Sequence, residues 1–239
     1  MRIIGHRGAR GEAPENTLGG FHYLHGLGVR AVEFDVRQLE DEQLVVIHDD
    51  NFIRTTGLSQ HVESCSLAQA QQFDHRHLWQ TWAEPEYTPS LVQVMACLTD
   101  FEHIEVEIKA VPDEAAAEKL IIQLHQDLKD FEKTAIITSF DVKIFAALQQ
   151  YQSHFKRGLL VEIPIAGHAI ELAQQYGCHQ IGWKDQLATD EMIKLTHQAD
   201  LNVSVWTVND IERAKHLQQL GIHGLITDIP STMLQHLSL

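Results

Sequence analysis

The hydrophobic positions of this chain follow two alternating periods. Short apolar runs typical of strands are separated by stretches in which apolar residues recur every three to four positions, as on one face of a helix. Strands are predicted at 2–7, 31–36, 44–48, 104–109, 134–140, 157–162, 180–184, 202–208 and 224–228. Helices are predicted at 15–27, 90–99, 113–130, 141–153, 167–176, 189–199, 209–220 and 230–237. Strand and helix therefore alternate along most of the chain.

This alternation predicts a parallel sheet with covering helices. A closed barrel needs eight strands, whereas the pattern gives nine candidates. The connection at 37–43 is shorter than the roughly one dozen residues that a parallel crossover requires, so 44–48 must return antiparallel to 31–36 as a hairpin. The eight remaining strands fit an α/β fold of the (β/α)8 TIM-barrel type.

Residues 50–89 form a long segment with weak patterning, which includes HRHLWQTWAEPEYTP. Loops of this length are usually functional or separately folded. The chain shows no repeat, low-complexity tract or linker. We therefore expect one barrel domain over 1–239, with 50–89 as a small insertion within it.

Composition restricts the possible partners. The 239 residues include 33 Asp and Glu against 18 Lys and Arg, which gives a net charge of −15. This excess argues against nucleic acid and against stable association with anionic membranes. Three cysteines without CxxC spacing, and an N-terminus without an apolar leader, favour the cytoplasm. The oligomeric state is left open.

Polar residues gather where the predicted strands end, which in such a barrel is the mouth that carries the active site. They are His6 and Arg7 after the first strand, Glu33 and Asp35 on the second, Glu105, Glu107 and Lys109 on the third parallel strand, and Trp206 on the seventh. Residues two apart on a strand share a face. Glu105 lies one layer deeper, so we expect it to be structural.

The hairpin adds a second histidine to the mouth. If its turn centres on residues 41 and 42, the numbers of opposed residues sum to about 83, and His48 faces Asp35. A bulge would shift this register by one residue. The predicted mouth then holds two histidines, at least three carboxylates, an arginine and a lysine.

Buried carboxylates on inward positions repel one another unless a cation lies between them. Oxygen ligands of this kind suit a hard divalent ion, Mg²⁺ or Ca²⁺. Arg7 and Lys109 beside such an ion indicate phosphate recognition, and His6 and His48 suit a general base and a general acid. Together these groups indicate metal-assisted phosphodiester cleavage.

The chain resembles the glycerophosphodiester phosphodiesterase family. The resemblance rests on HRG (6–8), PENT (14–17), EFDV (33–36), VVIHDDNFIRTT (45–56), TPSL (88–91), VEIK (106–109), SF (139–140), VWTVN (205–209) and GLITD (224–228), which occur in family order. Each motif is weak by itself, whereas the ordered set is specific.

The resemblance implies a (β/α)8 barrel and assigns roles to individual residues. These are His6 and His48 as catalytic residues, Glu33, Asp35 and Glu107 as ligands of one Mg²⁺ or Ca²⁺ ion, Arg7, Lys109 and Trp206 as substrate-binding residues, and Glu15, Asn16 and Asp49 as supporting residues. The implied reaction is hydrolysis of a small-molecule glycerophosphodiester, such as glycerophosphocholine or glycerophosphoethanolamine, to glycerol 3-phosphate and an alcohol.

Two other functions remain as alternatives. The same site could serve a lysophospholipase D or phospholipase C-like activity on lipids. Trp79, Trp82 and Tyr87 of the insertion could then supply membrane access, although the net charge argues against it. A barrel without activity that serves as a scaffold is the third hypothesis. Against it, each histidine and each expected metal ligand is present.

Overall fold

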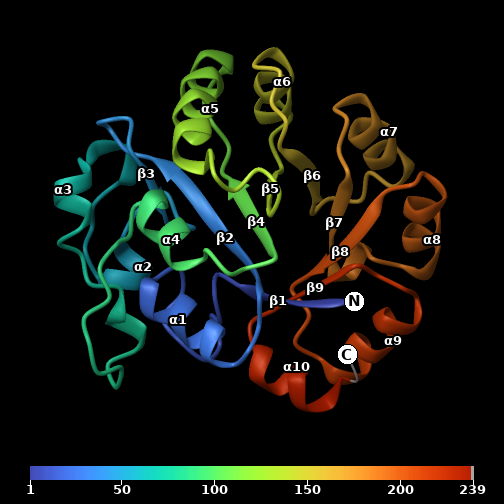
Figure 1. Cartoon of the computed structure of the whole chain (residues 1–239), viewed down its shortest axis with the longest axis horizontal. Helices are drawn as coiled ribbons and strands as arrows, with labels where there is room; N and C mark the ends of the chain where they lie inside the picture. The colour runs from blue at the N-terminus through green and yellow to red at the C-terminus, as the bar shows by residue number, and fades with distance from the viewer. Residues whose placement is uncertain (238–239) are drawn as a thin grey trace.

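Eight strands run parallel around a closed barrel in the computed structural model, which describes residues 1–237 (Figure 1). They are β1 (Arg2–His6), β2 (Ala31–Gln38), β4 (His103–Ile108), β5 (Ala135–Ser139), β6 (Lys156–Val161), β7 (Gln180–Lys184), β8 (Asn202–Trp206) and β9 (Gly224–Thr227). Pairing of β1 with both β9 and β2 closes the ring. The predicted TIM barrel is confirmed.

Helices follow the strands and cover the outside of the barrel (Figure 1). The main ones are α1 (Leu18–Gly26), α4 (Leu91–Cys97), α5 (Glu114–Leu128), α6 (Val142–Gln150), α7 (Gly167–Gln175), α8 (Asp190–Gln198), α9 (Ile211–Gln219) and α10 (Pro230–His236), with the 3₁₀ helix η3 (Asp185–Leu187) before α8. In α5 the apolar stripe from Ala117 to Leu128 is buried, and the Asp113 side chain caps its N-terminus. The predicted helix positions therefore agree with the structure to within a few residues.

The ninth strand, β3 (Leu44–Val46), runs antiparallel to the end of β2, as the short connection predicts. The predicted register is wrong by one residue. Val36 faces Val46 and Gln38 faces Leu44, so opposed numbers sum to 82. The turn is closed between Leu39 and Gln43, with Glu42 in the left-handed region at φ 63°. His48 consequently lies beyond the paired residues instead of opposite Asp35.

Residues 50–89 contain four short helical segments, α2 (Ile53–Thr56), η1 (Val62–Ser64), α3 (Leu67–Ala70) and η2 (Arg76–Leu78). They pack beside β3 at one flank of the barrel (Figure 1). A small apolar cluster joins this segment to the hairpin; it contains Leu39, Val45, Ile47, Phe52, Val62, Cys65 and Ala70. The hairpin is thereby held by its pairing with β2 and by its apolar contacts with residues 50–89.

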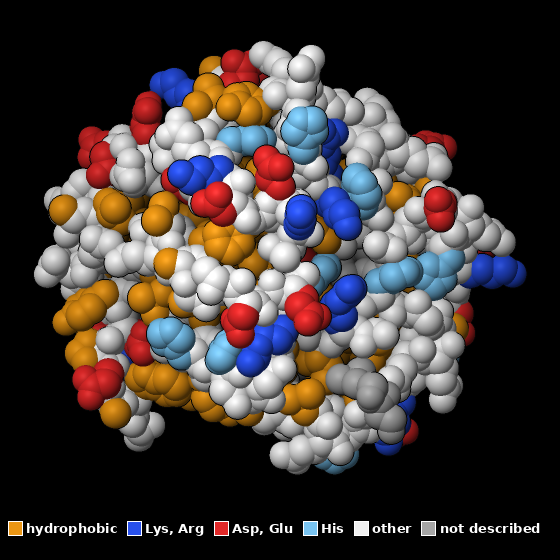
Figure 2. Space-filling model, in the orientation of Figure 1, with side chains coloured by type: hydrophobic (Ala, Val, Ile, Leu, Met, Phe, Trp, Pro, Cys, Tyr) orange, Lys and Arg blue, Asp and Glu red, His pale blue; other side chains and the backbone are white. Residues whose placement is uncertain are grey.

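Charged side chains of both signs share the surface. On the face drawn in Figure 2, acidic, basic and histidine side chains are interspersed near the middle of the view. Within residues 1–237, no helix is both long enough and apolar enough to cross a membrane.

Candidate active site

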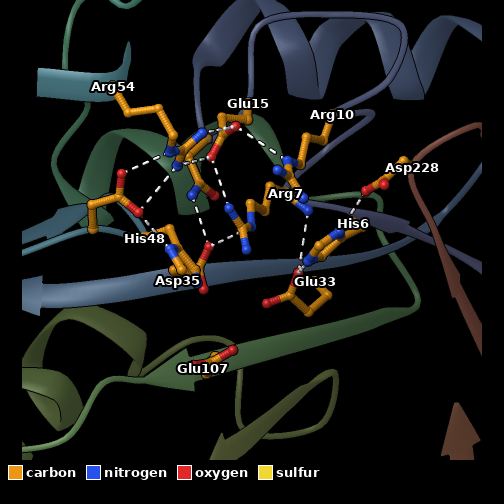
Figure 3. Close-up of polar contacts among 12 residues, drawn as sticks. His6, Arg7, Arg10, Glu15, Glu33, Asp35, His48, Arg54, Glu107 and Asp228 are labelled. Carbon is orange, nitrogen blue, oxygen red and sulfur yellow. Dashed lines mark hydrogen bonds and ion pairs between the residues drawn. The ribbon is translucent and has the colours of Figure 1, made fainter. Parts of the chain in front are cut away.

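Strand register brings three acidic side chains together at the mouth of the barrel. His6 of β1 is level with Glu33 of β2, and Asp35 of β2 is level with Glu107 of β4. Glu33, Asp35 and Glu107 are all buried, and one carboxylate oxygen from each lies within 4.8 Å of the others. The three predicted ligands therefore converge, as Figure 3 shows.

Burial makes this acidic group unfavourable in its fully ionised form. Burial, followed by the charge of Asp35, raises the pKa of Glu107 to about 7 and also raises the pKa of Glu33. Burial opposes ionisation of Asp35 as well, but Lys109 and Arg7 hold the pKa of its carboxyl well below the usual range. The Lys109 ammonium lies 2.5 Å from Asp35 and also contacts Glu107.

The carboxylates fit a hard divalent cation. Glu33 Oε1 is buried and has no hydrogen-bond partner among the described residues. An oxygen of this kind, beside two further carboxylates, suits Mg²⁺ or Ca²⁺. Glu105 does not join the group: it is buried and pairs with His103 at 2.9 Å, as expected for a structural residue.

His6 is held by an aspartate from the far end of the chain. Its Nδ1 lies 2.6 Å from Asp228 Oδ1, and its Nε2 lies 3.9 Å from Glu33 Oε2. Asn209 donates to the other Asp228 oxygen at 2.8 Å. Burial lowers the pKa of His6, although the Asp228 hydrogen bond acts in the opposite direction. The aspartate fixes Nδ1 as the bonded nitrogen and leaves Nε2 toward the carboxylates.

His48 has an aspartate partner of its own. Its Nδ1 lies 2.7 Å from Asp49 Oδ1, and its side chain is 36% exposed. Arg37 Nε donates to the His48 carbonyl at 2.8 Å, which ties the backbone here to β2. The mouth thus contains two His–Asp pairs, one deep and one near the surface.

Glu15 and Asn16 connect these groups. Glu15 accepts hydrogen bonds from Arg7, Arg10 and Arg54. Burial opposes ionisation of Glu15, but the Arg54 hydrogen bonds and the Arg7 charge lower its pKa to about 2. Asn16 donates to Asp35 at 2.9 Å. Arg7 and Asn16 both have positive φ, at 52° and 56°, and such backbone strain concentrates at functional sites.

A cavity of about 560 Å³ lies at the mouth of the barrel. Its wall contains both histidines, Arg7, Glu33, Glu107 and Lys109, together with Arg10, Arg37, Phe140 and Trp206. The Trp206 ring packs edge-on against Phe140, with 5.4 Å between ring centroids, and its Nε1 donates to the Gly182 carbonyl. The cavity wall therefore combines charged side chains with an aromatic pair.

The structure brings together all the predicted site residues: His6, Arg7, Glu15, Asn16, Glu33, Asp35, His48, Asp49, Glu107, Lys109 and Trp206. Sequence reasoning missed Asp228, Arg54, Arg10, Arg37 and Phe140. Asp228 and Arg54 lie inside the GLITD and RTT motifs, but nothing in their spacing indicates which histidine each one serves.

A TIM barrel whose mouth combines a buried three-carboxylate group, two histidines and nearby cationic side chains has the groups that a metal-assisted phosphodiester hydrolase requires. Residues 6–232 match the model of the glycerophosphoryl diester phosphodiesterase family. The chain belongs to this family.

Relatives cover nearly all of the chain. A glycerophosphodiester phosphodiesterase of Caldanaerobacter subterraneus subsp. tengcongensis is 28% identical over 97% of this chain and 96% of its own length. Human lysophospholipase D GDPD1 is 23% identical over 96% of this chain and 84% of its own. A phosphodiesterase of Oleispira antarctica, solved with sn-glycerol-3-phosphate, superposes with a TM-score of 0.89 at 24% identity, covering 99% and 96% of the two chains.

Proposed function

We propose that this protein hydrolyses small glycerophosphodiesters, such as glycerophosphocholine and glycerophosphoethanolamine, to glycerol 3-phosphate and an alcohol. The observation that carries the proposal is the convergence of Glu33, Asp35 and Glu107 between two His–Asp pairs. Glu33, Asp35 and Glu107 would hold one Mg²⁺ or Ca²⁺ ion. When bound, the ion supplies positive charge that stabilises the phosphoryl oxygens and acidifies a nearby hydroxyl.

The protein side chains supply proton transfer and orientation. One histidine accepts the proton of the attacking hydroxyl while the other donates a proton to the oxygen of the leaving alcohol, so the P–O bond breaks without releasing a free alkoxide. Each uses Nε2, because its Nδ1 is bonded to an aspartate. The attacking hydroxyl belongs either to the glycerol, which gives a cyclic phosphate that water opens, or to water directly.

Arg7 and Lys109 add positive charge on the same side of the cavity. Both contact buried carboxylates, and both face the cavity that the two histidines share. A phosphodiester carries one negative charge, which these cations and the divalent ion offset. Trp206 and Phe140 form the apolar wall, against which we expect the carbon skeleton of the glycerol to pack.

The test is an assay with glycerophosphocholine in the presence of Mg²⁺ or Ca²⁺, before and after chelation. We expect chelation to abolish product formation and either ion to restore it. His6→Ala and His48→Ala should each lower kcat by about 10²- to 10⁴-fold. Activity that survives chelation would remove the metal from the proposal, and full activity in either variant would remove that histidine.

One observation favours a second activity, that of a lysophospholipase D on single-chain lipids. The segment 50–89 exposes Ile53, Leu58, Leu78 and Tyr87 at 51%, 45%, 61% and 51%. Hydrophobic side chains also gather at the lower left of Figure 2, over the region of α1 and α2 in Figure 1. The two activities are distinguished by comparing kcat/KM for lysophosphatidylcholine with kcat/KM for glycerophosphocholine. A ratio of the first to the second above one favours the lipid activity.

A further inference from the structure

Arg54 donates hydrogen bonds to two carboxylates, those of Glu15 and Asp49. Figure 3 shows Arg54 beside Glu15. Its Nε and Nη2 donate to the two oxygens of Asp49 at 2.7 and 3.2 Å. Its Nη1 and Nη2 donate to the two oxygens of Glu15 at 2.6 and 2.8 Å. A planar guanidinium is suited to such paired contacts, which fix orientation as well as distance.

The backbone that carries Arg54 is firmly held. Arg54 lies on α2, a single turn that directly follows Phe52. The Phe52 ring is fully buried and packs edge-on against Phe73, with 4.8 Å between centroids. The Phe52 amide donates to Gln60, and the Asn51 side chain accepts from the Ile53 amide. The insertion thereby presents Arg54 to the mouth on a rigid support.

Asp49 depends on Arg54 for its orientation. Its side chain is 24% exposed, and Oδ1 accepts from both His48 Nδ1 and Arg54 Nη2. The two contacts from Arg54 hold the carboxylate plane so that Oδ1 stays aimed at the imidazole. Without them, this partly exposed carboxylate is free to rotate into water, and His48 loses the partner that selects its tautomer.

We propose that Arg54 is a positioning residue for His48, and that it acts through Asp49. This inference rests on the proposed two-histidine function. Arg54 touches neither the acidic group nor the cavity wall, so it contributes through alignment. The chain His48–Asp49–Arg54–Glu15–Arg7–Asp35 is continuous. The insertion therefore takes part in the active site as the element that orients one of its two histidines.

The experiment compares Arg54→Ala and Arg54→Lys with Arg76→Ala. Arg76 is a matched control, because it lies in the same insertion and donates to both oxygens of Asp74, and it does not line the cavity. Two readouts are needed: kcat and KM for glycerophosphocholine with saturating Mg²⁺, and ¹⁵N-histidine NMR of the metal-free protein. The NMR signal of His48 is assigned by its loss in His48→Gln.

We expect Arg54→Ala to lower kcat by about 10- to 100-fold, with KM changed by less than roughly threefold. The Nδ1–H signal of His48 should disappear or broaden. Added guanidinium should restore part of kcat in Arg54→Ala. The kcat of Arg54→Lys should lie between those of Arg54→Ala and the parent protein, because an ammonium group lacks the paired donors of a planar guanidinium. Arg76→Ala should keep both kcat and the signal, even if its thermal midpoint falls.

Either of two results would overturn the inference: an intact His48 signal with unchanged kcat in Arg54→Ala, or equal losses in Arg54→Ala and Arg76→Ala. If Arg54→Ala does not fold, the inference is tested with Arg54→Lys, again by kcat and by the His48 NMR signal. Failure of the proposed function is separate, because it shows as full activity in His48→Ala. The NMR arm still reports whether Arg54 fixes the ring.

Discussion

The carboxylates of the mouth illustrate how neighbouring residues of one type acquire different properties. Glu33, Asp35 and Glu107 are all buried, yet the pKa of Asp35 is lowered and the pKa values of the two glutamates are raised. The difference follows from Lys109 and Arg7, which both contact Asp35. Asp35 therefore stays ionised without an ion, whereas the glutamates gain most from one.

Metal affinity should consequently depend on pH. The pKa of Glu107 is raised to about 7 by burial and by Asp35, and its proton competes with the metal. We expect the affinity for Mg²⁺ or Ca²⁺ to rise about tenfold between pH 6 and pH 8, measured by isothermal titration calorimetry. Glu107→Gln should bind weakly at both values. Equal affinities for the parent protein at pH 6 and pH 8 would contradict this account.

Asp228 offers a second test at the level of single residues. Asp228→Asn keeps the shape of the side chain but removes the charge that holds His6 Nδ1–H. We expect kcat for glycerophosphocholine to fall by about 10²-fold or more. Asp185→Asn is a suitable control, since Asp185 pairs with Arg213 and does not line the cavity. An unchanged kcat in Asp228→Asn would show that His6 needs no charged partner.

At the scale of elements, the hairpin and the segment after it determine where His48 lies. The periodicity correctly predicts each barrel strand and each main helix, because every helix buries one apolar stripe against a nearly continuous apolar strand. The one-residue error in the β2–β3 register has a local cause, since the left-handed conformation of Glu42 sets the turn. No residue pattern indicates that conformation.

The residues of the site also divide into those that the sequence predicts and those that it does not. Glu33, Asp35 and Glu107 were predictable because strand periodicity places them on one face, and adjacent parallel strands bring the faces together. Asp228 and Arg54 were not, because their contacts depend on barrel closure and on a segment without periodicity. Residue type alone does not identify such long-range partners.

The insertion should make the protein sensitive to acid. His75 is buried, its Nε2 bonds to Thr88, and burial lowers its pKa to about 4 even though Glu15 and Asp74 act in the opposite direction. The unfolded chain takes up this proton near the ordinary value of 6.5, so the free energy of unfolding falls as pH drops from 6.5 toward 4.

We expect this group to contribute a loss of about 3 kcal/mol between pH 7 and pH 4. His75→Gln keeps a hydrogen-bonding side chain but does not titrate in this range, so its stability should vary less with pH. Urea denaturation at pH 4, 5.5 and 7 measures the difference. Parallel stability curves for the two proteins would show that His75 is not responsible.

At the scale of the whole molecule, stability depends on the seam where β1 meets β9. Gly224 of β9 is level with Arg2 of β1, and a Cβ placed there would lie 2.6 Å from Ile4 Cδ1 and 3.2 Å from Ser204 Cβ. The absence of a side chain at residue 224 thus leaves room for the Ile4 side chain of β1 at this seam. Overpacking at such a contact is destabilising.

We therefore expect Gly224→Ala to lower the free energy of unfolding by about 1–3 kcal/mol. Gly26→Ala is the matched control: it lies at the end of α1, and no atom would lie within 4 Å of the added carbon. That change should raise the free energy by about 0.4–1 kcal/mol, because it restricts the unfolded chain. Chemical denaturation measures both, and equal effects of the two substitutions would argue against a tight seam.

The His6–Asp228 pair has a consequence for how the enzyme is made. These residues are 222 positions apart, whereas His48, Asp49, Arg54 and Glu15 all lie within the first 54 residues. A ribosome adds about 5–20 residues per second, so Asp228 emerges roughly 10–35 s after Arg54. One histidine pair is available early in translation, while the other is completed only by the last strand. A nascent chain therefore cannot form the complete two-histidine site until residue 228 has been synthesised.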